Sequence, residues 1–203
     1  MSRFRSSRPE NCSDGRLRIH FMYMRRTKGA KRDPFKQWGL PEKVFFACGA
    51  CHILAAAFLR RYPNEGFAAI WIRPVTGHTG NHIVVVRDDL AFDYHGYSNW
   101  DRLWAHMRRR ANQWLPGWDA SLVKLPEDVL VSHSKSRMYD GLWLKGPKDF
   151  LIDPMPRAQA YLNRFPAPPK RVPPSGRGLS QAEVQQRFLV GAIDLDPFRG
   201  LVS

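Results

Sequence analysis

The chain has 203 residues, of which 43% are hydrophobic and 12% aromatic, enough for one buried core with extensions. Its 32 lysines and arginines against 18 acidic residues give a net charge of +14, which favours nucleic acid, anionic membranes or acidic proteins as partners. No apolar run reaches the roughly 18 residues of a membrane span, and three cysteines are too few for a disulfide scaffold.

The N-terminal segment contains no apolar signal sequence, and the cysteine count is odd. Both features favour a reducing compartment. We therefore expect a cytoplasmic protein, or one delivered by a specialised secretion system.

Residues 1–36 predict a basic, loosely structured arm, because arginines and lysines crowd there among serine, glycine and proline. Within this arm, Leu17–Met24 alternates enough to suggest a single strand. Residues 37–165 carry the mixed pattern of an α+β domain. Residues 166–203 begin with a proline-rich linker that cannot hold a helix, followed by a short terminal helix that Ser180 and Glu183 would cap.

Helical spacing of apolar residues over Ala50–Arg61, ahead of Pro63, predicts a core helix. Three apolar, β-branched runs then predict strands: Phe67–Ile72, His82–Val86 and Leu90–Tyr94. The short turn between the last two strands favours an antiparallel hairpin. Two more helices are expected, each with its own start signal: Trp100–Gln113 after a cap at Ser98, and a helix from Asp153 and Pro154 toward Asn163.

Three residues in this domain carry chemistry. Cys51 starts the core helix, where unpaired N–H groups and the helix dipole lower a thiol pKa. His82 opens a strand, and Asp93 lies 11 residues further on, in the paired strand of the expected hairpin. A histidine with a carboxylate partner can serve as general base and acid for a thiol nucleophile. The pattern predicts a cysteine hydrolase or acyl transferase.

The segment Cys48-Gly49-Ala50-Cys51-His52 resembles the Cys-Gly-x-Cys motif of papain-like cysteine proteases, in which the second cysteine is the nucleophile. The segment from Asn81 to Asp93 resembles the His-strand, turn and Asp-strand of the transglutaminase-like and NlpC-type branches of that superfamily. The resemblance implies a papain-like α+β fold, with the nucleophile helix packed on an antiparallel sheet.

By this resemblance the catalytic residues are Cys51, His82 and Asp93, with no cofactor, and the Cys51 N–H is one oxyanion donor. The papain-type glutamine before the nucleophile has no counterpart, so the second donor is unassigned. Four polar residues near the triad are expected to line the cleft: His52, His78, Asn81 and His95. His95 is also an alternative partner for His82.

The implied reaction is acyl transfer at an amide, by a protease, amidase, deamidase or transglutaminase. A protein or peptide substrate is expected, and the basic surface favours an acidic one. The loosely structured termini that the sequence predicts suggest a small protein that travels, such as a bacterial or phage effector. The alternative from another class is a basic nucleic-acid-binding or scaffold protein with an inactive papain-like core, whose arm binds the nucleic acid.

Other interpretations of these residues stay open. Cys51 could be a small buried hydrophobe, His82 a satisfied core histidine and Asp93 a loop cap. The segment Cys48–His52 also matches the c-type haem attachment pattern, the thioredoxin Cys-x-x-Cys and half of a zinc site. Haem attachment would require export, and no second ligand pair completes a zinc site.

Overall fold

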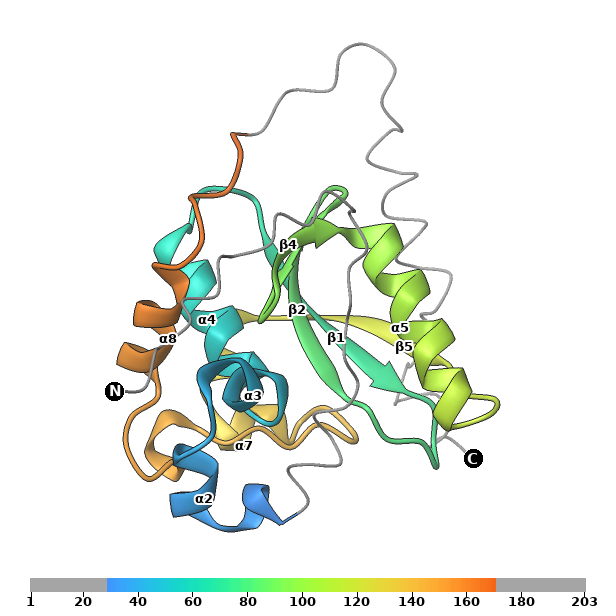
Figure 1. The fold of residues 1–203 in the computed structure, drawn as a ribbon, viewed down its shortest axis with the longest axis horizontal. Coiled ribbons are helices and arrows are strands. Elements are labelled where there is room, and N and C mark those ends of the chain that lie inside the picture. Colours follow the sequence, from blue (N-terminus) through green and yellow to red (C-terminus); the bar gives the residue numbers. More distant parts are fainter. Residues whose placement is uncertain (1–28, 171–203) are drawn as a thin grey trace, which may run out of the picture.

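The computed structural model describes residues 29–170. Five strands form one antiparallel sheet in the order β4-β3-β2-β1-β5 (Figure 1). The strands are β1 Ala68–Pro74, β2 His82–Arg87, β3 Leu90–Asp93, β4 Gly96–Asn99 and β5 Ala120–Leu125. The α+β fold class predicted from the sequence is therefore confirmed.

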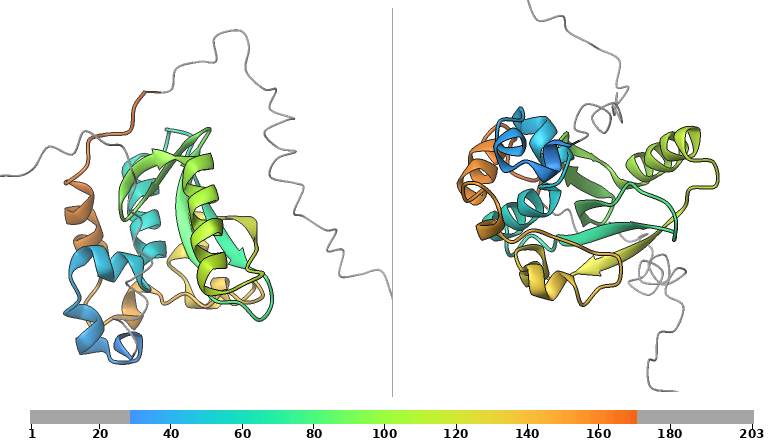
Figure 2. Two further views of the ribbon diagram at one scale, coloured as in Figure 1. Left: turned by 45° about the vertical axis from the view of Figure 1, so that its right-hand side comes forward. Right: turned by 90° about the horizontal axis from the view of Figure 1, so that it is seen from below.

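Helices cover both faces of this sheet (Figure 2). The helices are η1 Ala30–Arg32, α2 Pro34–Trp38, α3 Glu42–Ala47, α4 Cys51–Arg61, α5 Trp100–Trp114, α6 Glu127–Leu130, α7 His133–Ser136, η2 Pro147–Asp149 and α8 Met155–Leu162. Helices α3, α4 and α8 lie on one side of the sheet, and α5 lies on the other. None of the helices in residues 29–170 is long and apolar enough to cross a membrane.

Alternating side chains of the strands supply two separate cores. Trp71, Val85 and Phe92 face the α4 side. Ile70 and Val84 face the α5 side. Every residue of β2 is buried because both faces of the sheet are covered, which explains its unbroken apolar run.

Helix α4 is the central helix of the larger core. Its residues from His52 to Phe58 are all buried, which fits its alanine-rich, apolar sequence. Arg60 and Arg61 in the last turn suit the negative end of the helix dipole, and the helix ends before Pro63. The predicted helix over Ala50–Arg61 thus starts one residue later, at Cys51, with Ala50 as its N-cap.

Strands β2 and β3 form the predicted antiparallel hairpin. Arg87 pairs with Leu90, so Asp88 and Asp89 make a two-residue turn in which Asp88 adopts a φ of 52°. Strand β3 ends at Asp93, one residue before the predicted end at Tyr94.

Helix α5 begins at Trp100 as predicted, but its predicted cap was wrong, and so was the predicted start of the last helix. The side chain of Asn99, not Ser98, caps α5 by accepting a hydrogen bond from the Arg102 N–H. Ser98 belongs to β4, a strand that the sequence did not reveal. The last helix begins at Met155 rather than at Asp153, although the Asp153 carboxylate accepts a hydrogen bond from the Met155 N–H.

Parts of the predicted termini fall outside the described residues, including the strand at 17–24 and the terminal helix after residue 180. Within the predicted arm, η1 and the first turn of α2 are described, and the Asp33 side chain caps α2. At the other end, the Tyr97 hydroxyl donates to the Pro166 carbonyl, and Arg87 donates to the Pro169 carbonyl. These contacts hold the start of the proline-rich linker against β4 and β2.

Gly96 is the first residue of β4 and pairs with Asp93, at the end of the turn that follows β3. Its φ is +99°, and a Cβ at this position would lie 2.7 Å from the Phe165 ring. We expect Gly96→Ala to lower the free energy of unfolding by about 1–3 kcal/mol, since both backbone strain and ring displacement oppose it. Urea denaturation measures this loss.

Gly77→Ala is the matched control, because Gly77 has a φ of +86° but no atom within 4 Å of the added Cβ. Its cost should be that of backbone strain alone, about 1 kcal/mol. Equal losses in the two variants would show that the contact with Phe165 does not constrain the turn.

Candidate active site

Cys51 is the first residue of α4, and its backbone environment favours an anion. Gly49 makes the sharp turn between α3 and α4 with a φ of +120°. Ala50, the N-cap, provides no capping side chain. The first N–H groups of a helix have no intrahelical partners, so those of Cys51 and His52 and the positive end of the helix dipole stabilise a thiolate or an oxyanion at this point.

His82 and Asp93 meet across the β2–β3 ladder, as their order in the sequence predicts. The His82 Nε2 lies 3.2 Å from the Asp93 Oδ2. Both residues are buried, His82 at 8% and Asp93 at 6% exposure. Their contact is therefore a buried, charge-assisted hydrogen bond in which Nε2 donates and the carboxylate accepts.

This hydrogen bond fixes the roles of the two imidazole nitrogens of His82. Because Nε2 is committed to Asp93, Nδ1 is the nitrogen left for the thiol of Cys51. An ionised carboxylate only accepts hydrogen bonds, so neutral His82 carries its proton on Nε2. Its Nδ1 lone pair is then free to take the proton of Cys51.

The three side chains shift one another's pKa. Burial opposes ionisation of Cys51, but hydrogen bonds and positive charge from His52 and His82 outweigh it and hold the thiol pKa well below its usual value. Burial likewise disfavours the imidazolium of His82, yet Asp93 and Cys51 raise its pKa to about 10.

The Asp93 carboxyl is affected in the same way. Burial opposes its ionisation, but its hydrogen bonds and its attraction to His82 and His95 keep its pKa well below the usual range. Together, Cys51, His82 and Asp93 favour a thiolate, an imidazolium and a carboxylate next to one another.

The space between Cys51 and Asp93 excludes water. A narrow gap between Cys51 and Asp93 has no room for a water molecule and is bordered mainly by apolar side chains: Leu54, Ala55, Ile83, Val85, Phe92 and Tyr94. The low dielectric of such a lining strengthens the interactions among the charged groups.

His95 contacts Asp93 mainly through its backbone. The His95 N–H donates to the Asp93 Oδ1 at 2.8 Å. The His95 Nδ1 also lies 3.3 Å from this oxygen, but without the alignment of a hydrogen bond. Asp93 is thus the group that contacts His82, while His95 holds the far oxygen of Asp93.

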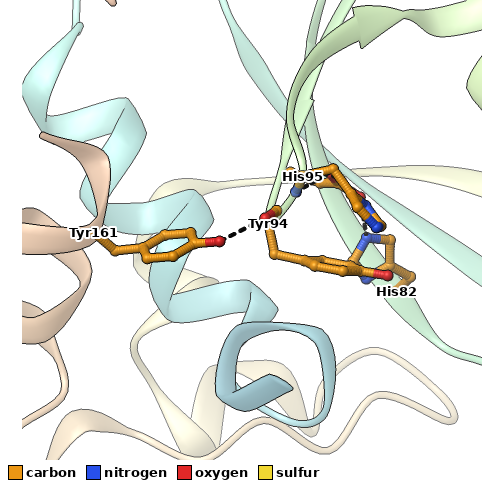
Figure 3. Close-up of polar contacts among 5 residues, drawn as sticks. His82, Tyr94, His95 and Tyr161 are labelled. Atoms are coloured by element: carbon orange, nitrogen blue, oxygen red, sulfur yellow. Dashed lines mark hydrogen bonds and ion pairs between the residues drawn. The ribbon is translucent and has the colours of Figure 1, made fainter. Parts of the chain in front are cut away.

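Tyr94 packs on the site from the same turn. Its ring stands edge-on to the His82 ring, with centroids 5.6 Å apart. The hydroxyl of Tyr161 on α8 donates to the Tyr94 carbonyl at 2.7 Å (Figure 3). Helix α8 therefore anchors the turn that follows Asp93.

His52, expected to line the cleft, is buried beside the nucleophile. Its Nε2 donates to the Lys145 carbonyl at 2.9 Å. The Lys145 ammonium in turn donates to Gln37 Oε1, and Gln37 is itself buried. The sequence gives no sign of Lys145 and Gln37 at this place, because no local pattern connects residues 93 or more positions apart.

The two other expected cleft residues lie in the β1–β2 loop. The exposed Asn81 directly precedes His82, and its Oδ1 accepts a hydrogen bond from Trp71 Nε1 at 2.8 Å. His78 has a buried Nδ1 without a hydrogen-bond partner, and no contact joins it to the triad within the described residues.

Neither Cys48 nor Cys51 forms a disulfide within residues 29–170. In the part of the chain that the structure describes, no group of three or more histidine, cysteine, aspartate or glutamate side chains could hold a metal ion. The zinc interpretation of Cys48, Cys51 and His52 therefore gains no further ligand from residues 29–170.

Comparison with known proteins identifies no relative. No family model, no curated protein and no solved structure matches the chain. Its function must therefore be inferred from the site.

Proposed function

We propose that this protein is a thiol-dependent hydrolase or acyl transferase acting on amides, with Cys51, His82 and Asp93 as its catalytic triad. The observation that carries the proposal is the buried contact of His82 Nε2 with Asp93 Oδ2 beside a thiol at the uncapped start of α4. A structural core histidine would need no thiol neighbour whose pKa it lowers.

In the first half of the reaction, the Cys51 sulfur attacks the carbonyl carbon of the amide. The carbonyl oxygen becomes an oxyanion, for which the Cys51 backbone N–H is one donor. His82 then gives its Nδ1 proton to the nitrogen as the C–N bond breaks. The amine leaves, and the acyl group remains on Cys51 as a thioester.

In the second half, water or another amine attacks the thioester carbonyl. His82 Nδ1 accepts the proton of this nucleophile, and the C–S bond breaks to regenerate the thiolate. Asp93 keeps the Nε2 proton in place throughout and stabilises the imidazolium. Water gives hydrolysis, and an amine gives transfer.

The sequence resemblance to papain-like cysteine proteases supports the same assignment. A nucleophile at the start of a central helix, followed by a histidine strand and an aspartate strand, is the order that the resemblance describes. Here the three residues come from α4, β2 and β3 of one antiparallel sheet and its packed helix. We therefore propose a papain-like core of the transglutaminase-like or NlpC-type arrangement.

Alkylation by iodoacetamide tests the proposal. A thiol with an ordinary pKa reacts about tenfold more slowly for each pH unit below that pKa. Because the Cys51 pKa is held well below its usual value while that of His82 is raised to about 10, the thiolate persists at about pH 6. We expect nearly equal labelling rates of Cys51 at about pH 6 and pH 8, measured by peptide mass spectrometry.

His82→Ala should make this labelling more strongly dependent on pH than in the wild type, because it removes one of the two imidazoles, His52 and His82, that outweigh burial and lower the Cys51 pKa. His133→Ala is the control, because His133 is exposed on α7 and does not belong to the site. If the labelling rate of wild-type Cys51 dropped from about pH 8 to about pH 6 as steeply as that of free cysteine, the proposal that the protein is a thiol enzyme would be rejected. Tight, salt-dependent binding to random duplex DNA would then favour the alternative of a nucleic-acid-binding protein.

A further inference from the structure

The segment Gly141–Lys145, between α7 and η2, contacts residues next to both His82 and Cys51. At one end, a Cβ on Gly141 would lie 4.0 Å from Trp71 Cη2, and Trp71 is hydrogen-bonded to Asn81, the neighbour of His82. At the other end, the Lys145 carbonyl accepts the hydrogen bond of His52, the neighbour of Cys51. The segment therefore links the histidine side of the site to the cysteine side.

Trp143 stands in the middle of this segment and points outward. Leu142 and Leu144 are 2% and 8% exposed and belong to the core, whereas Trp143 is 70% exposed. Two Cα steps separate Trp143 from each anchored end, so its Cα lies within about 8 Å of the Cα atoms of both Gly141 and Lys145. A large exposed ring thus lies two residues from the carbonyl that accepts the hydrogen bond of His52, the neighbour of Cys51.

Two neighbours extend the surface around Trp143. Arg137 places its guanidinium 4.5 Å from the centre of the Trp143 ring. Met138, in the same loop, is 83% exposed. Arg137 makes no ion pair within residues 29–170, so its charge is available to a ligand. An exposed indole, a thioether and an unpaired guanidinium together suit an apolar side chain next to a carboxylate.

We infer that Arg137, Met138 and Trp143 form a substrate subsite for a polypeptide segment that carries an aromatic side chain beside an acidic residue. The inference rests on the proposed function, and it names the substrate class of the same site. The net charge of +14 adds general attraction for acidic chains.

Trp and Arg can also bind nucleic acid, but the surroundings favour a peptide. Asp140, whose side chain is 92% exposed, lies in the same loop and pairs with Arg73. Its carboxylate repels a continuous phosphate backbone, whereas a peptide can place a single carboxylate on Arg137.

Electrophilic peptides test the subsite without a known substrate. Two iodoacetyl-Gly-Gly peptides of equal length would be compared, one ending in Phe-Glu and one in Ala-Gln. In both, the thiolate of Cys51 displaces iodide and forms a thioether, so only peptide binding differs. We expect the Phe-Glu peptide to alkylate wild-type Cys51 about tenfold faster than the Ala-Gln peptide does. The rate with iodoacetamide, which is too small to reach the subsite, measures the reactivity of the thiol alone.

Matched variants locate the effect. Trp143→Ala and Arg137→Gln should remove most of the advantage of the Phe-Glu peptide and leave the iodoacetamide rate unchanged. Trp114→Ala and Arg102→Gln should keep the advantage, since both residues are exposed on α5, on the other face of the sheet. An advantage that survives Trp143→Ala, or that is absent from the wild type, overturns the subsite.

Two further outcomes separate the possible explanations. Loss of the advantage in the presence of a random DNA duplex, together with weaker duplex binding by Trp143→Ala, would assign the surface to nucleic acid and overturn the peptide subsite. Slow iodoacetamide labelling of wild-type Cys51 would reject the proposed enzyme instead. In that case, equilibrium binding of the unreactive acetyl-Gly-Gly-Phe-Glu peptide to the wild type and Trp143→Ala decides on the subsite alone.

Discussion

Cys51→Ala is expected to abolish acyl transfer while the protein stays folded. The chemistry needs a sulfur nucleophile, and alanine cannot provide one, so kcat should fall by at least roughly 10⁴-fold. Alanine is the best helix former and suits the first position of α4. Hydrolysis of an amide substrate measures the loss, and thermal unfolding checks the fold.

Cys48→Ala is the matched control, three residues earlier in the chain. Cys48 is the C-cap of α3 and is 4% exposed, so it packs in the interior, whereas Cys51 stands at the start of α4. This variant should retain most of the activity and lose only some stability. If both variants were equally inactive, a Cys-x-x-Cys redox or metal site would replace the triad.

Much of the domain core could be predicted from local patterns. Apolar residues at helical spacing located α4, and β-branched runs located β1, β2 and β3, because periodicity reports which faces are buried. The short turn between β2 and β3 fixed their pairing, and with it the closeness of His82 and Asp93. The two residues of the central contact lie only 11 positions apart, so local sequence patterns were enough to predict it.

Strands β4 and β5 were not predicted, for physical reasons. Strand β4 consists of Gly96, Tyr97, Ser98 and Asn99, residues that mostly disfavour strands, and it forms by pairing with β3. Strand β5 is a partly exposed edge strand that pairs with β1, about 50 residues earlier in the chain. In both strands tertiary pairing outweighs local preference.

The surroundings of the nucleophile were equally invisible in the sequence. The hydrogen bond from His52 to the Lys145 carbonyl depends on packing between segments 93 residues apart. The acceptor is a backbone carbonyl, which every residue has, so no sequence motif could predict this hydrogen bond. The exposed Trp143 likewise becomes meaningful only once its neighbours Leu142 and Leu144 are seen in the core.

Asp93→Asn is expected to reduce kcat by roughly 10²–10⁴-fold. The His95 N–H donates to Oδ1 of residue 93 at 2.8 Å, so an asparagine would turn its carbonyl oxygen toward that donor. Its NH₂ group would then face His82 Nε2 and donate to it. Neutral His82 would be forced to carry its proton on Nδ1, where it can no longer accept the proton of Cys51.

The pH dependence should change in a defined direction. Burial lowers the pKa of His82, but Asp93 and Cys51 together raise it to about 10. His82 therefore stays protonated up to about that pH. Without the carboxylate the pKa of His82 falls, and the alkaline limb of the kcat profile moves to lower pH. Rates measured from about pH 5 to 11 would show this shift.

His95→Gln separates the roles of the two neighbours of Asp93. Since the backbone N–H of residue 95 makes the aligned hydrogen bond to Asp93 Oδ1, replacing the ring leaves that bond in place. Its effect on kcat should therefore be smaller than that of Asp93→Asn, with little movement of the alkaline limb. An inactive His95→Gln beside an unaltered pH profile of Asp93→Asn would make His95 the partner of His82 and remove Asp93 from the triad.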